Sequence, residues 1–242
     1  MSIRYLVATI ALAAATASSA AVLVVRSSGP SSRNFPPGKS LDDNGKIALK
    51  ANDTLVVLDA RGTRPMKGPG TVTPGGPAKA AGAMSSLSAV TGSGRARARV
   101  GAVRSVGLGA PKPSVWNVDV SKSSNICVAT TGSVSLLRAD PSKPVTLTVA
   151  GGNAKADRKI DWAAGRSTIS WPSDLPISDG AEYRLSWDGA RVPTRLQFRT
   201  LPSRPTALQE IASTLIENGC TAQLDLLIET AKLPESTSTP TS

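Results

Sequence analysis

Histidine is absent from the 242-residue chain, and aromatic residues make up only 3% of it. Histidine is the commonest general base, activator of nucleophiles and zinc ligand in proteins, so its absence disfavours most hydrolase mechanisms and most zinc sites. The glycine-rich stretches carry no following Walker lysine that would indicate a nucleotide site. The sequence therefore favours a non-enzymatic protein with no catalytic residues, no cofactor and no metal.

Two catalytic arrangements need no histidine, namely a serine–lysine dyad and a pair of carboxylates. Asp42 and Asp43 are adjacent, so in a strand their side chains would point to opposite faces, and we interpret them as turn or edge residues. Lys122 and Ser123 are neighbours within a predicted turn. Neither pair has the arrangement that catalysis requires, although a measured turnover would revive both.

The chain begins with a long uncharged segment. Arg4 is the only charged residue before Arg26, and residues 5–25 are mostly alanine, leucine, isoleucine, valine, serine and threonine. A basic start, an apolar run and small residues at 17–21 are typical of a signal peptide, so we expect residues 1–20 to be cleaved after Ala20 and the protein to be periplasmic. The alternative is an inner-membrane anchor over residues 5–25, since about 20 apolar residues span a bilayer.

Only two cysteines are present, Cys127 and Cys220. In an oxidising compartment an even number of cysteines usually indicates disulfides, so we predict that these two are bonded. The bond would close a loop of more than 90 residues. Two separate buried thiols are the alternative.

Acidic residues are absent between Gly76 and Ser114, where six of the basic residues lie, and the formal net charge of the chain is +11. Glycine, alanine and serine dominate the same segment, which predicts a flexible linker over residues 76–114. It has no aromatic residues for base stacking, so we expect no nucleic-acid partner. The candidate contacts with an anionic cell-wall or lipid surface are Arg95, Arg97, Arg99 and Arg104. A solvated linker without such contacts is equally compatible with the composition.

Short strand patterns dominate the rest of the chain, which predicts a mainly β protein. Residues 21–75 indicate a small β domain of about five short strands, including a hairpin around Asn52 and Asp53. Residues 115–202 contain about seven or eight strand patterns at regular intervals, typical of an antiparallel β-sandwich. We expect its tryptophans to contribute mainly to the core; they are Trp116, Trp162, Trp171 and Trp187.

Tyr183 opens one of these alternating strands, a few residues after Leu175 and Pro176. The arrangement resembles the tyrosine corner of immunoglobulin-like and fibronectin-like sandwiches. An ordinary turn before a strand with a core tyrosine is the alternative.

The pattern changes to a helical period over residues 203–233 and predicts a helical hairpin that docks on the sandwich. Thr206 and Gln209 have the spacing of a capping box, and Thr221 is placed to cap the second helix. Residues 234–242 consist of proline, serine, threonine and one glutamate, a composition that predicts a disordered tail.

The segment from Gly38 through Leu41, Leu49 and Leu55 to Gly70 has short strands, a glycine before a leucine and a closing glycine-rich turn. In this it resembles the periplasmic β-domain of FecR-type regulators, over about residues 22–75. The resemblance implies a periplasmic sensing or scaffolding role. Only residues 1–4 precede the export segment, in place of the cytoplasmic anti-sigma domain of such regulators, so direct sigma-factor control is not implied.

These features support two hypotheses. The first is a non-enzymatic periplasmic interaction or sensing module that acts with a membrane signalling or envelope partner. The second is a structural envelope protein that its basic linker holds to peptidoglycan or anionic lipid. The sequence predicts no particular oligomeric state.

Overall fold

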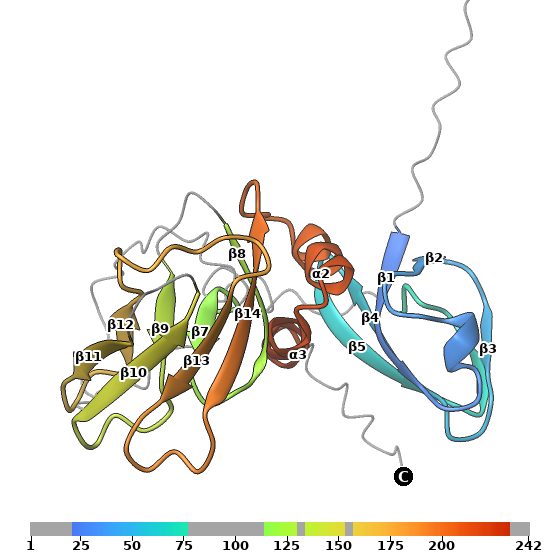
Figure 1. Cartoon of the computed structure of the whole chain (residues 1–242). Helices are drawn as coiled ribbons and strands as arrows, with labels where there is room; N and C mark the ends of the chain where they lie inside the picture. The colour runs from blue at the N-terminus through green and yellow to red at the C-terminus, as the bar shows by residue number, and fades with distance from the viewer. Residues whose placement is uncertain (1–20, 77–113, 130–133, 153–156, 233–242) are drawn as a thin grey trace, which may run out of the picture.

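A computed structural model of the chain describes residues 21–76, 114–129, 134–152 and 157–232. Within these ranges the protein is mainly β, which confirms the predicted fold class. A small β unit, a larger β-sandwich and a pair of helices follow one another along the chain, and the helices lie between the two β parts (Figure 1). The predicted signal peptide, most of the predicted linker and the predicted tail lie outside the described residues.

The N-terminal unit is built on a four-stranded antiparallel sheet with the order β2-β1-β4-β5, and β3 pairs with β6 in a second, smaller sheet. Its elements are β1 (Ala21–Ser28), the 3-10 helix η1 (Ser32–Asn34), β2 (Ser40–Asp42), β3 (Ile47–Leu49), β4 (Thr54–Asp59), β5 (Gly62–Lys67) and β6 (Gly70–Val72). The segment that follows the predicted cleavage site is therefore an inner strand, and its four apolar residues at 22–25 are buried.

The hairpin predicted around Asn52 and Asp53 is wrong. Strands β3 and β4 flank these residues, but β3 pairs with β6, whereas β4 pairs with β1 and β5. The buried Asp53 carboxylate accepts hydrogen bonds from the backbone N–H groups of Lys50, at 2.6 Å, and Ser31, at 2.8 Å. It thereby holds the turn after β3 against the loop after β1, and the chain passes from one sheet into the other.

The sandwich consists of one sheet with the order β11-β10-β13-β14-β8 and another with the order β12-β9-β7. Trp162 and Trp171 are buried in its core, Trp187 packs at the edge of that core, and Trp116 is buried near the helices, as their predicted core role requires. The strands are β7 (Asn117–Asp119), β8 (Ser124–Ala129), β9 (Ser135–Leu137), β10 (Val145–Gly151), β11 (Arg158–Trp162), β12 (Thr168–Ser170), β13 (Glu182–Ser186) and β14 (Thr194–Leu201).

The sandwich is not antiparallel throughout, as the strand patterns led us to expect. Strand β8 runs parallel to β14, and β7 runs parallel to β9. Parallel neighbours need a long connection, and five other strands of the sandwich separate β8 from β14 along the chain. Side chains alternate with a period of two in both kinds of sheet, so the sequence pattern does not distinguish them.

Tyr183 forms the predicted tyrosine corner. Its side chain is buried, and its hydroxyl donates a hydrogen bond to the carbonyl oxygen of Pro176, seven residues earlier. The ring meets the rings of Trp171 and Phe198 edge to face, with centroids 4.9 and 5.8 Å away. Burial raises the pKa of the Tyr183 hydroxyl, so the group remains a donor at neutral pH.

Replacement of Tyr183 with phenylalanine should lower the free energy of unfolding by about 1–2 kcal/mol, because it removes the hydroxyl donor and keeps the ring. Urea unfolding measures the change. Thr146→Val is the control, since the exposed Thr146 hydroxyl donates to Asp161 at the surface and its loss should cost less than about 0.5 kcal/mol. Equal effects of the two substitutions would contradict a special role for the corner.

The predicted helical hairpin is present. Gly219, with φ of +66°, adopts the left-handed conformation that ends the first helix. Apolar residues of both helices are buried against the β parts, so tertiary packing supports helices of this short length. The two helices are α2 (Leu208–Glu217) and α3 (Thr221–Thr230).

The predicted helix caps are wrong. Ala207 and Cys220 occupy the N-cap positions, and neither provides a side-chain cap. Thr206 lies one residue before the first cap, and Thr221 is already the first residue of α3. The Gln209 amide, expected in a capping box, instead donates to the carbonyl oxygen of Ala21 in β1, at 2.6 Å. The Gln209 side chain therefore makes a tertiary contact with β1 instead of capping its own helix.

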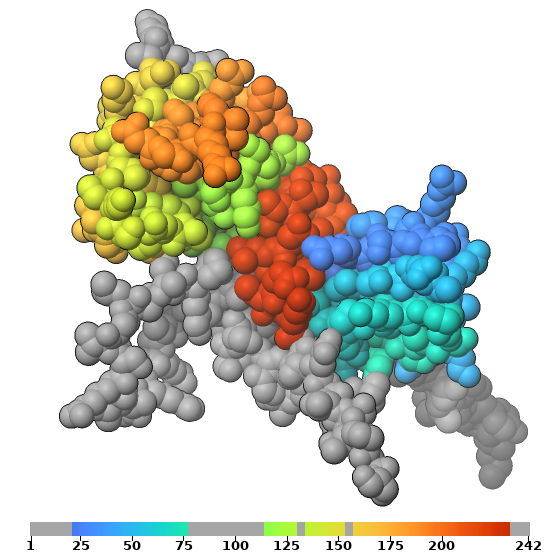
Figure 2. All heavy atoms as spheres, turned by 90° about the horizontal axis from the view of Figure 1, so that it is seen from below, coloured from blue at the N-terminus to red at the C-terminus, as the bar shows by residue number. Residues whose placement is uncertain are grey.

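The hairpin docks on both β parts and not only on the sandwich. One continuous core joins all three, and Figure 2 shows the helices, in red, between the blue and cyan N-terminal unit and the green and orange sandwich. The N-terminal unit contributes Leu23, Val25, Val56 and Leu58; the sandwich contributes Val115, Trp116, Cys127 and Leu201; and the helices contribute Ile211, Ala212, Leu215, Cys220, Leu224, Leu227 and Ile228. The two β parts are therefore packed on a common centre.

Hydrogen bonds reinforce the contact between the N-terminal unit and α3. Thr63 of β5 donates its backbone N–H to the carbonyl oxygen of Ala231, at 2.8 Å, and its buried hydroxyl to that of Ile228, at 2.9 Å. These carbonyl groups belong to the last turn of α3, which has no further helical donors to satisfy them. Thr63 thus completes the end of the helix from another part of the chain.

Candidate functional site

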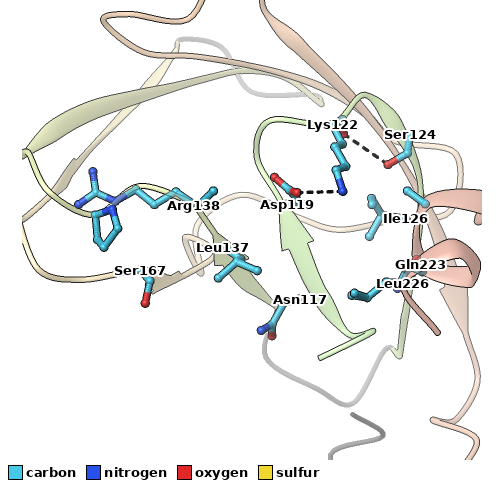
Figure 3. Close-up of a pocket in the computed structure, with 13 residues that line it drawn as sticks. Asn117, Asp119, Lys122, Ser124, Ile126, Leu137, Arg138, Ser167, Gln223 and Leu226 are labelled. Atoms are coloured by element: carbon cyan, nitrogen blue, oxygen red, sulfur yellow. Dashed lines mark hydrogen bonds and ion pairs between the residues drawn. The ribbon is translucent and has the colours of Figure 1, made fainter. Parts of the chain in front are cut away.

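A groove of about 480 Å³ lies between the sandwich and α3. Its lining includes residues of β7 and β8, the outer strands of the two sheets. Figure 3 shows its lining side chains, which come from these two strands, from the end of β9, from α3 and from the loops after β7, after β9 and before β12. The volume falls within the usual range for ligand sites, about 300–1,000 Å³.

The three largest apolar side chains of the groove are Ile126, Leu137 and Leu226. Ile126 of β8 is buried, whereas Leu137 of β9 and Leu226 of α3 are half-buried and present some carbon to solvent. Asn117 and Ser167 add polar groups at its margin. An apolar floor with a few polar groups at the rim is typical of a binding site for a partly apolar ligand.

The disulfide and Gln223 hold the wall of the groove in place. Cys127 of β8 is bonded to Cys220, whose Cα lies 5.9 Å away, as the sequence predicts. The buried Gln223 side chain accepts the N–H of Cys127 at 2.6 Å and donates to the carbonyl oxygens of Cys127, at 3.0 Å, and Val115, at 2.7 Å. Its amide thus occupies the open edge of β8 at one residue, as a neighbouring strand would.

Arg138 also lines the groove, but its guanidinium group is already hydrogen-bonded within the protein. The side chain is buried, and its guanidinium donates to the carbonyl oxygens of Lys143, Ala163 and Arg166 at 2.8 to 3.0 Å. The group also lies over the Trp162 ring, 4.9 Å from its centroid. Arg138 therefore fixes the loops around the groove and contributes mainly its carbon chain to a ligand.

The ionisable residues at the rim, Asp119 and Lys122, stabilise the turn between β7 and β8. Asp119 accepts hydrogen bonds from the backbone N–H and the hydroxyl of Ser121, at 2.9 and 2.6 Å, and Lys122 lies 3.5 Å from the same carboxylate (Figure 3). The hydroxyl of Ser124 donates to the backbone carbonyl oxygen of Lys122 at 3.4 Å and not toward the lysine amine. The contacts join β7 to β8 and present no activated nucleophile.

The residues singled out in the sequence have different positions relative to the groove. Cys127 and Cys220 lie behind its wall, and Asp42 and Asp43 lie on the N-terminal unit, at the end of the outer strand β2 and in the turn after it. The four candidate surface-binding arginines, at 95, 97, 99 and 104, lie outside the described residues. The prediction that they contact an anionic surface therefore stays a prediction.

Sequence reasoning missed the groove itself. Ile126, Leu137 and Leu226 are ordinary apolar members of strand and helix patterns, and nothing in the pattern separates partly exposed members from core members. Gln223 gave the one available signal, since it is a polar residue at a buried position in the stripe that includes Leu227. A buried amide usually has specific hydrogen-bond partners, which here are on β8.

Two further properties concern the described residues as a whole. No group of three or more cysteine, aspartate and glutamate side chains among them could hold a metal ion. No helix among them is long and apolar enough to cross a membrane.

Comparison with known proteins found no similarity. No protein-family model matches the chain, and no curated protein or solved structure matches it.

Proposed function

We propose that this protein is an exported, non-enzymatic binding protein of the bacterial periplasm. In this proposal it uses the groove between β7, β8 and α3 to hold an extended, partly apolar segment of a membrane signalling or envelope partner. The observation that carries the proposal is the groove. It has an apolar floor beside β7 and β8, which have no further strand neighbour among the described residues, and a disulfide braces its wall.

Export is supported by the disulfide and by β1. Disulfides persist in oxidising compartments and are rare in the bacterial cytosol. Strand β1 also places residues 21–25 inside a sheet, where a membrane anchor over residues 5–25 would remove them from the fold. Residues 5–20 alone are fewer than the about 20 that a spanning helix needs. Cleavage before β1 leaves the folded part whole.

An extended segment suits the groove because of the strand edges. Outer strands present backbone N–H and C=O groups that a further strand can pair with, and such pairing is a common mode of peptide recognition. Gln223 occupies the β8 edge at Cys127, so a partner would pair next to that residue and place its apolar side chains against Ile126, Leu137 and Leu226. The FecR-like rhythm of residues 22–75 agrees with a sensing or scaffolding role.

Leu226→Lys should abolish partner binding through the groove, because it places a charge on the apolar floor while Leu226 is only half-buried in the fold. Val192→Lys is the matched control, since Val192 is 74% exposed and lies outside the groove. Both variants of the tagged mature protein are compared with the parent by cross-linking in envelope extracts, with identification of the cross-linked peptides. The proposal predicts a partner segment that cross-links to the parent and to Val192→Lys but not to Leu226→Lys.

The same experiment tests the structural alternative. More than half of the net positive charge of +11 comes from six basic residues between Gly76 and Ser114, which favours attraction to an anionic surface. Such attraction weakens as salt screens it, whereas contacts in an apolar groove persist. Recovery of cell-wall or lipid material alone, lost at high salt and equal for both variants, would overturn the groove proposal and support the structural role.

A further inference from the structure

A second site lies at the beginning of β1, far from the groove in the fold (Figure 1). Ala21 is opposite Asp42 in the antiparallel pair of β1 and β2. Because the strands run in opposite directions, the chain leaving β2 passes the amino side of Ala21. Asp43, the residue after Asp42, therefore follows β2 at the end of the pair where β1 starts.

Ala21 and Asp43 both line a cavity of about 420 Å³. One carboxylate oxygen of Asp43, Oδ1, is buried and has no hydrogen-bond partner among the described residues. The neighbouring Asp42 accepts the backbone N–H of Asn44 at 3.0 Å. A buried carboxylate oxygen without a donor is destabilising, and most such groups in folded proteins have a partner.

A second carboxylate in this cavity, that of Asp59, already has hydrogen-bond donors. Asp59 accepts hydrogen bonds from Arg61 at 2.6 Å and from Arg64 at 3.0 Å, and the same arginines donate to the carbonyl oxygen of Gly75. Burial raises the pKa of Asp59, but the hydrogen bonds from Arg61 and the charge of Arg64 outweigh it, and the pKa lies below its usual value. Of these two residues, Asp43 is thus the one with a buried carboxylate oxygen that lacks a donor.

We propose that Ala21 is the first residue of the mature protein and that the Asp43 carboxylate binds its α-ammonium group. The inference rests on the export part of the proposed function and not on the groove. Hydrolysis of the bond between Ala20 and Ala21 adds one water, leaves a carboxylate on Ala20 and converts the Ala21 amide nitrogen into an ammonium group. The nitrogen gains a positive charge and two N–H donors. It can therefore donate a charged hydrogen bond to the Asp43 oxygen that has no donor.

Strand β1 restricts the cleavage position to the bond before Ala21. A cut further along would remove apolar residues at 22–25 that are buried on both faces of the sheet, and a cut further back would leave an uncharged amide nitrogen beside Asp43. The carbonyl oxygen of Ala21 is already held by Gln209 of α2, so the end of the strand is fixed when the new amine forms. Cleavage before Ala21 then adds an ion pair at the start of a strand that Gln209 already holds in place.

The test uses the full chain exported and processed in bacteria. Intact mass should show Ala21 as the first residue. Asp43→Asn should lower the equilibrium constant for folding about fivefold, and so should one extra alanine before Ala21, whereas the two changes together should cost no more than either alone. Asp42→Asn is the control, and its effect should be below about twofold because Asp42 is exposed.

A second readout does not depend on stability. At neutral pH an acylating reagent should modify the Ala21 amine several-fold more slowly in the parent than in Asp43→Asn, because the ion pair holds the amine protonated. A mature start other than Ala21, additive effects of the two changes, or equal acylation rates would each overturn the proposal. None of these readouts involves the groove, so failure here leaves the binding proposal standing, and failure of binding leaves this one standing.

Discussion

Reduction of the Cys127–Cys220 disulfide should lower the free energy of unfolding by about 3–5 kcal/mol. The bond joins residues 93 positions apart, and opening it returns the entropy of a long loop to the unfolded chain. Guanidinium unfolding with and without a reductant measures the difference.

The double variant Cys127→Ala with Cys220→Ala provides the control. It should be destabilised to a similar extent, and the reductant should then have no further effect on it. Because Cys127 also anchors the wall of the groove through Gln223, reduction should weaken partner binding as well. A change in unfolding free energy below about 1 kcal/mol would contradict the role assigned to this bond.

Leu227→Ala should lower the free energy of unfolding by about 3–5 kcal/mol. Leu227 is fully buried in the core that joins the N-terminal unit, the sandwich and the helices. Loss of its side chain leaves a cavity at the point where both β parts meet α3. Hydrogen exchange should therefore show faster exchange of amides in β4 and in β8 at the same time.

Leu147→Ala is the matched control for this substitution. It removes the same side chain from a site that is equally buried, but in the separate core of the sandwich. It should destabilise the sandwich by a comparable amount and leave exchange in β1 and β4 nearly unchanged. If Leu227→Ala also leaves the N-terminal strands protected, the two β parts are not coupled through the helices.

Several features of the fold were predictable because each depends on a short segment or on simple counting. The apolar stripe of α2 and α3 and the alternation of β10, β13 and β14 have periods that follow from the backbone geometry of helix and strand. Two cysteines allow one disulfide, and it forms. Tyr183 stands a fixed distance after Pro176, so its corner was visible as a local pattern.

Other features were mispredicted because distant residues decide them. The turn around Asp53 has a local hairpin signal, yet its carboxylate is bound to Ser31, and β3 and β4 enter different sheets. Gln209 has the spacing of a cap, yet it donates to Ala21, 188 positions away. In both cases a hydrogen bond between remote parts of the chain outweighs the local preference, which is worth only about 1 kcal/mol.

By itself the sequence determined the composition of each element, the single disulfide pairing and the mainly β class, and it predicts an export signal. The tertiary structure alone decided which strands are neighbours, the parallel pairing of β8 with β14, the shared core around α3 and the groove beside it. The physical reason is that periodicity is set by the backbone of one segment, whereas pairing and cavities are set by surfaces that meet only after the whole chain has folded.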